Sequence, residues 1–160
     1  MKLNVDNIEA DLTRLLYERL SIASLERMAS IVVKSEDNEG TSFSILPFDD
    51  KQAGAIVQYE DGSKWVNLDV AENTVLEIPL DGEQYTDKAG IEELFTILDG
   101  IITEGMEEIV WKKDGEIVGS IGTFYVKGEK DPVIVNCYTL HNPFAAKSKA
   151  TRKYLPYIES

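Results

Sequence analysis

Two Asp-Gly dipeptides constrain the fold of this chain more than any other sequence feature. Each lies between two runs rich in apolar and β-branched side chains. An Asp-Gly pair in that setting is typical of a two-residue β-hairpin, because both turn positions need a positive φ. Such hairpins predict antiparallel sheets and argue against a parallel, doubly wound sheet. The dipeptides are Asp61-Gly62, between residues 53–60 and 63–70, and Asp114-Gly115, between residues 106–113 and 116–126.

Two other segments have the apolar spacing of amphipathic helices. Asp6 and Glu9 predict a capping box at the start of the first, in which each side chain accepts a bond from an end amide. Gly105 is expected to end the second, since glycine readily takes the left-handed conformation that closes a helix. The helices are expected over residues 6–30 and from Thr86 or Asp87 to Gly105.

The order of these elements predicts an α+β fold. An N-terminal helix is followed by an antiparallel β-meander, a second helix and further antiparallel strands. The length of 160 residues favours a single globular domain over residues 1–160. Trp111 is expected in its core, because tryptophan is mostly buried. The remaining strands are expected over residues 30–35, 41–46, 74–79 and 132–140.

The C-terminal segment, residues 143–160, is basic. Asn142 can cap a short helical segment that has Pro143 at its first position and ends at Pro156. We expect this segment to dock on the acidic middle of the chain, held mainly by apolar side chains, because exposed ion pairs contribute only about 0–1 kcal/mol each. A frayed tail is the alternative.

Negative charge is concentrated in the middle of the chain. Residues 41–100 carry thirteen acidic and three basic side chains, a net charge of −10 out of −13 for the whole chain. A field of that sign repels nucleic acid and anionic membranes and attracts a basic protein partner. The start of the chain has no apolar signal segment, and no run is long enough to cross a membrane. We therefore expect a cytoplasmic protein.

The first hairpin places Trp65 on a polar face. A two-residue turn puts Glu60 opposite Ser63 and Gln58 opposite Trp65, and opposed residues share a face. Trp65 then lies among carboxylates, as an aromatic anchor for a basic partner would. The alternative is that another element covers this face and makes Trp65 part of a second core. The candidate partner-binding residues are Gln58, Glu60, Trp65 and Asp69, together with the acidic pair Asp49 and Asp50.

No pattern of catalytic residues, metal ligands or cofactor-binding residues is recognisable. Cys137 and His141 stand four residues apart, which is about 13 Å along a strand and too far for a hydrogen bond. Three hypotheses follow for the function. The first is a non-enzymatic protein whose acidic face binds a basic partner, most concretely an immunity-type inhibitor of a bacterial toxin. The second is an acidic chaperone or adaptor, and the third is a metal-assisted hydrolase that uses the central carboxylates.

Overall fold

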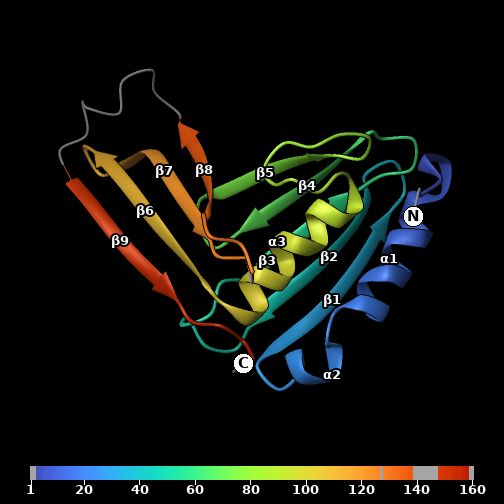
Figure 1. Cartoon of the computed structure of the whole chain (residues 1–160), viewed down its shortest axis with the longest axis horizontal. Helices are drawn as coiled ribbons and strands as arrows, with labels where there is room; N and C mark the ends of the chain where they lie inside the picture. Colours follow the sequence, from blue (N-terminus) through green and yellow to red (C-terminus); the bar gives the residue numbers. More distant parts are fainter. Residues whose placement is uncertain (1–2, 127, 139–147, 159–160) are drawn as a thin grey trace.

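Two antiparallel sheets and two main helices form the protein, which confirms the predicted α+β class (Figure 1). The computed structural model describes residues 3–126, 128–138 and 148–158. The five-stranded sheet has its strands in chain order: β1 (Ala29–Glu36), β2 (Gly40–Pro47), β3 (Ala55–Tyr59), β4 (Trp65–Val70) and β5 (Thr74–Pro79). The four-stranded sheet has the order β8-β7-β6-β9, with β6 (Met106–Lys113), β7 (Glu116–Phe124), β8 (Val133–Tyr138) and β9 (Ser148–Tyr154).

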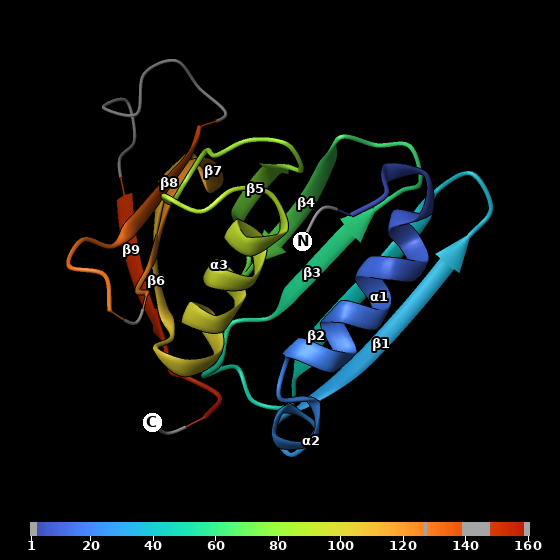
Figure 2. The same cartoon turned by 45° about the vertical axis from the view of Figure 1, so that its right-hand side comes forward.

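Both main helices lie on one face of the five-stranded sheet. Figure 2 shows α1 (Ile8–Arg19) and α3 (Ile91–Thr103) side by side there, with the four-stranded sheet flanking α3. One apolar cluster joins the two sheets and both helices, because buried side chains from α1, β3, α3 and β7 all belong to it. The opposite face of the five-stranded sheet carries no helix in the described part of the chain.

The first helix is shorter than predicted, and the predicted capping box does not form. A single turn, η1 (Val5–Asn7), precedes α1, and a short helix, α2 (Ile22–Leu25), follows it. α1 ends because Leu20 takes an extended conformation and turns its side chain into the core. The side chain of Asn4, not that of Glu9, accepts a bond from the amide of Asp6. The amide of Glu9 instead donates to Asp61 Oδ1, at 2.8 Å.

That long-range bond also changes the first hairpin. β3 and β4 are joined by residues 60–64 instead of a two-residue turn, and Gln58 lies opposite Asn67, not Trp65. The loop is longer because its tip holds α1: Asp61 accepts from the amide of Glu9, and the amide of Gly62 donates to Val5 O. The register therefore differs from the prediction by two residues. A shift of two leaves every side chain on its predicted face.

The second helix ends as predicted but begins later. α3 starts at Ile91, after Gly90 in a left-handed conformation with φ 58°. The expected caps, Thr86 and Asp87, lie in an irregular loop. The side chain of Glu93 is fully buried and accepts bonds from the amides of Gln84, Tyr85 and Thr86, so these amides are satisfied without a helix.

The basic C-terminal segment forms a strand where a short helix was predicted. β9 pairs antiparallel with β6, which would otherwise offer an open edge, and Tyr154 at its end is buried. Residues 143–147 and 159–160 lie outside the described part. The segment pairs mainly with β6, which lies outside the acidic middle. It also contacts residues 41–100, because Arg152 donates to Glu72 and to Asp50 O, and the amide of Leu155 donates to Lys51 O.

The second hairpin has the predicted strands, but its tryptophan is not in the core. A bulge between Trp111 and Lys112 pairs Trp111 with Gly119, whereas a regular two-residue turn would place it opposite Val118. Trp111 is half-buried and lies on the outer face of the four-stranded sheet, directly opposite Lys149 on β9. The expectation of a core tryptophan is therefore wrong.

Candidate functional site

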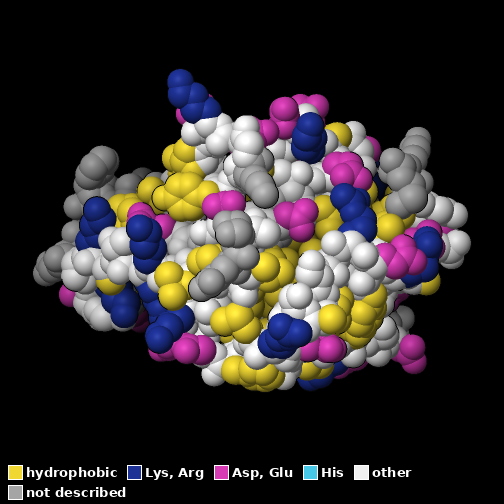
Figure 3. All heavy atoms as spheres, turned by 60° about the horizontal axis from the view of Figure 1, so that its bottom comes forward, with side chains coloured by type: hydrophobic (Ala, Val, Ile, Leu, Met, Phe, Trp, Pro, Cys, Tyr) yellow, Lys and Arg dark blue, Asp and Glu magenta, His cyan; other side chains and the backbone are white. Residues whose placement is uncertain are grey.

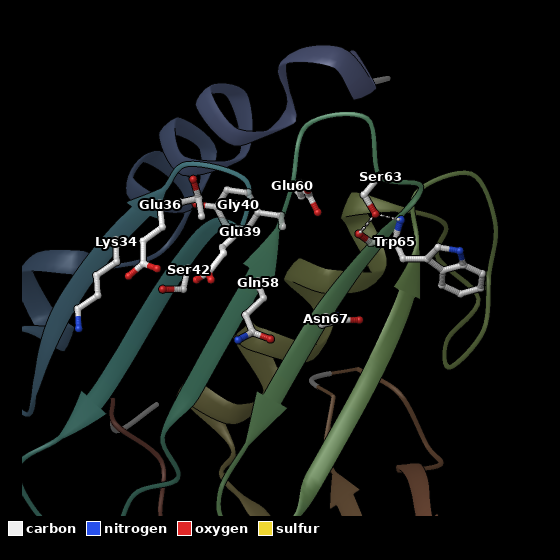
Figure 4. A pocket seen from close by; sticks show the side chains of 12 residues that line it. Lys34, Glu36, Glu39, Gly40, Ser42, Gln58, Glu60, Ser63, Trp65 and Asn67 are labelled. Carbon is white, nitrogen blue, oxygen red and sulfur yellow. Dashed lines mark hydrogen bonds between the residues drawn. The ribbon is translucent and has the colours of Figure 1, made fainter.

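The candidate site lies on the face of the five-stranded sheet that is opposite α1 and α3, here called the open face (Figure 4). One side chain from each strand forms a continuous polar row across it, because the register places the five residues directly opposite one another in turn. Their exposed amide and charged groups give this face its polar character. The row is Lys34, Ser42, Gln58, Asn67 and Glu77.

A hollow of about 340 Å³ occupies one end of the open face. It extends from Lys34 on β1 to Trp65 on β4, with Gln58 and Asn67 between them (Figure 4). Its floor includes four residues of the polar row, all except Glu77, and its edge is formed by the β1–β2 turn and the loop between β3 and β4. The hollow is thus shallow and polar, with one aromatic side chain, and it suits a protruding side chain of another molecule.

Trp65 is presented at the edge of this hollow. Its side chain is 48% exposed, so the alternative of a second core is wrong. The hydroxyl of Ser63 accepts from the amide of Trp65 and donates to its carbonyl oxygen, at 3.2 and 3.1 Å. These two bonds fix the backbone at the first residue of β4. A partner that contacts the indole therefore meets an already ordered backbone, which limits the conformational entropy lost on binding.

Three glutamates line the same hollow: Glu36, Glu39 and Glu60. Hydrogen bonding to the carboxyl of Glu36, together with repulsion from its charge, raises the pKa of Glu39 above its ordinary value. None of the three forms an ion pair with another described residue. An added cation from outside would therefore relieve the repulsion between Glu36 and Glu39.

Only three of the six predicted partner-binding residues lie together in the structure. Gln58, Glu60 and Trp65 line the hollow together. Asp69 lies on the same face but in the next cross-strand row, opposite Ile56, where burial raises the pKa of its carboxyl. Asp49 and Asp50 follow β2 at the other end of the sheet. The Asp49 carboxylate accepts from the amide of Lys51, and that of Asp50 pairs with Arg152 at 3.4 Å.

Several lining residues were missed by the sequence reasoning. Lys34, Glu36 and Glu39 belong to the hairpin of β1 and β2, and Ser42 lies in the second of these strands. The predicted strands over residues 30–35 and 41–46 are consecutive in the meander. Pairing them as a hairpin could have indicated which of their side chains share a face. Placing these side chains at the hollow also required the register between β2 and β3, which the irregular connection over residues 48–54 does not reveal.

The described residues define no candidate metal centre. They contain no group of three or more His, Cys, Asp or Glu side chains that could hold a metal ion. The thiol of Cys137 donates to Val75 O at 3.6 Å, and its supposed neighbour His141 lies outside the described residues. Basic side chains gather elsewhere, at the end of the molecule formed by β6 and β9 (Figure 3).

Comparison with known proteins gave no relative. No family model, no curated protein and no solved structure matches this chain. Within the described ranges, no helix has the length and apolar character needed to span a membrane.

Proposed function

We propose that the open face of the five-stranded sheet binds a basic protein partner, and that the protein is an immunity-type inhibitor of a bacterial toxin. The observation that supports this most directly is the exposure of Trp65 in a hollow whose carboxylates pair with no basic side chain among the described residues. Interface hot spots are enriched in tryptophan, and they are most effective when charged groups around them match the partner.

The charge of the surrounding chain supports the same proposal. The lining residues fall between positions 34 and 67. Most of them therefore belong to residues 41–100, the part of the chain that carries a net charge of −10. A lysine or arginine of the partner can place its charge near Glu36 and Glu39, while a separate apolar side chain of the partner contacts the indole of Trp65, three strands away on β4. An inhibitor of this kind needs surface complementarity and no catalytic group.

Replacing Trp65 tests the proposal. The partner is first captured from an extract of the source organism with the full chain as bait, and then purified. Trp65→Ala should weaken its binding by about 2 kcal/mol or more, roughly thirtyfold in Kd, because truncating an aromatic anchor removes most of its contact area. The melting temperature should change little, since the side chain is half exposed. Isothermal titration calorimetry and a thermal melt measure the two quantities.

Trp111→Ala is the matched control, because Trp111 is the only other tryptophan and lies on a different sheet. It should leave partner binding unchanged. A normal affinity in Trp65→Ala, or a large fall in its melting temperature, would contradict the proposal. An immunity-type inhibitor should also abolish the activity of a toxic partner at equimolar amounts. A partner that keeps its activity in the complex would favour the chaperone or adaptor hypothesis instead.

Association should be fast and sensitive to salt. Exposed acidic charge steers a basic partner towards the open face, and this steering weakens as the Debye length falls to about 8 Å at physiological ionic strength. Stopped-flow measurements should show an on-rate that falls severalfold as salt is raised, with a shallower dependence for Glu60→Gln. An on-rate independent of salt would show that the acidic face does not guide recognition.

A further inference from the structure

The outer edge of β1 offers unpaired backbone groups. Among the described residues β1 pairs only with β2, so it is an edge strand, and Figure 2 shows its outer side clear of the labelled helices and strands. The amide of Phe48 donates to Met28 O and continues the register of β1 with β2. Bonding alternates along an antiparallel pair, so the even-numbered residues of β1 bond to β2. The backbone groups of Ile31, Val33 and Ser35 therefore point outwards.

Other sheet edges carry features that hinder strand addition, and β1 has few. At the edge of β5, the hydroxyl of Tyr85 accepts from the amide of Glu77, and the thiol of Cys137 donates to Val75 O. The edge strand β9 is rich in lysine and arginine, which discourage pairing. β1, by contrast, is eight residues long and contains three consecutive β-branched residues, 31–33.

A groove lies directly beside this open edge. It has a volume of about 590 Å³ and separates α1 from β1. Ala10, Thr13 and Tyr17 line it from the helix, and Val33 and Ser35 line it from the strand. Tyr17 is 47% exposed and packs edge-on against Phe43. An edge strand next to a helix-lined groove is the arrangement in which domains such as PDZ and PTB bind extended peptides.

We propose that the basic partner adds an extended segment to β1 as a sixth strand of this sheet, with alternate side chains in the groove between α1 and β1. The basic character of this occupant rests on the proposed function. An added strand has two sides: one follows Val33 and Tyr17 and suits apolar residues, and the other follows Lys34 and Glu36 at the hollow and suits polar residues, with a lysine or arginine opposite Glu36. A second copy of the chain is a poorer occupant, because each copy carries a net charge of −13.

A synthetic peptide tests strand addition without the natural partner. The probe is an acetylated heptapeptide in which lysine and valine alternate, titrated into the isotope-labelled full chain and followed by NMR. Shifts are expected along β1 and at Ala10, Thr13 and Tyr17. Val33→Pro removes an outward amide without removing a bond to β2, and it also removes a side chain that lines the groove, so it should weaken binding at least tenfold. Ala10→Phe fills the groove and should do the same, while Ala23→Phe on α2, also exposed, should not.

Changes in the peptide keep the test independent of protein folding. Methylating its alternate backbone nitrogens should abolish binding, and replacing lysine with glutamate should weaken it at least tenfold. Equal binding of the methylated peptide would overturn strand addition, as would a dimer of the free protein that Val33→Pro dissociates. Trp65→Ala is tested on the natural partner and not on the peptide. If Trp65→Ala weakens binding of the natural partner as predicted but the peptide does not bind, this inference is wrong and the proposed function stands.

Discussion

A chain that ends at residue 147 should fail to fold at 25 °C. It lacks β9 and the residues after it, which attach to several separate parts of the molecule. The amides of Tyr157 and Ile158 both donate to Ile102 O at the end of α3, and the hydroxyl of Tyr157 donates to Ala53 O at 2.6 Å. Tyr154 and Tyr157 are each 5% exposed. Losing a buried aromatic side chain costs about 3–5 kcal/mol, and a whole domain is stable by only about 5–15 kcal/mol.

Point substitutions separate this effect from the general damage of a truncation. Tyr157→Ala should lower the free energy of unfolding by about 3–5 kcal/mol. Tyr157→Phe keeps the packing, removes one buried hydrogen bond and should cost about 1–2 kcal/mol. The matched control is Tyr125→Ala, since Tyr125 is 41% exposed and should matter little. Urea unfolding measures all three, and a truncated chain with native stability would show that β9 is not part of the fold in solution.

Glu108→Ala should cost about 3 kcal/mol of stability, although it replaces a charged residue. Glu108 is 2% exposed on the inner face of β6. Its carboxylate accepts from the amide and the side-chain nitrogen of Asn73, each at 3.1 Å, and from the hydroxyl of Thr74 at 2.7 Å. These bonds join the four-stranded sheet to the β4–β5 turn of the other sheet. Alanine would leave buried donors without a partner, which is more costly than a typical lost hydrogen bond.

The neighbouring Glu107 provides the control for this prediction. It lies on the opposite face of β6, beside Lys153 on β9, and Glu107→Ala should change stability by less than about 1 kcal/mol. Glu108→Gln retains the shape of the side chain and part of its capacity to accept hydrogen bonds. Its loss of stability should therefore lie between those of Glu108→Ala and Glu107→Ala. Thermal unfolding should show a melting temperature about 10 °C lower for Glu108→Ala. Equal values for the two alanine variants would show that the carboxylate does not join the sheets.

The sequence predicted the parts of the fold that depend on local pattern. Alternation placed Trp65 on the polar face of its hairpin, and the structure buries Val57, Val66 and Leu68 on the other face, so this assignment survived a register error of two residues. The error arose because Asp61 binds the amide of Glu9, a residue 52 positions away. No local rule for Asp-Gly turns contains that information.

Long-range partners also explain the other differences. The late start of α3 depends on a buried glutamate, Glu93, that satisfies three loop amides, whereas the periodic pattern marks only its apolar neighbours. The strand at residues 148–154 depends on the free edge of β6. In the candidate site, Gln58, Glu60 and Trp65 were predictable from one hairpin. Glu36 and Glu39 were not, because they reach the hollow through the pairing of a different hairpin.

The two tryptophans allow one direct measurement of where the partner binds. Trp65 lies at the hollow of the open face and Trp111 on the outer face of the four-stranded sheet, so their indole N–H signals report separately on the two surfaces. The purified partner is titrated into the isotope-labelled full chain, and both signals are followed by NMR. We predict that the Trp65 signal shifts or broadens with partner concentration while the Trp111 signal stays in place. A shift of Trp111 with Trp65 unchanged would contradict recognition by the open face.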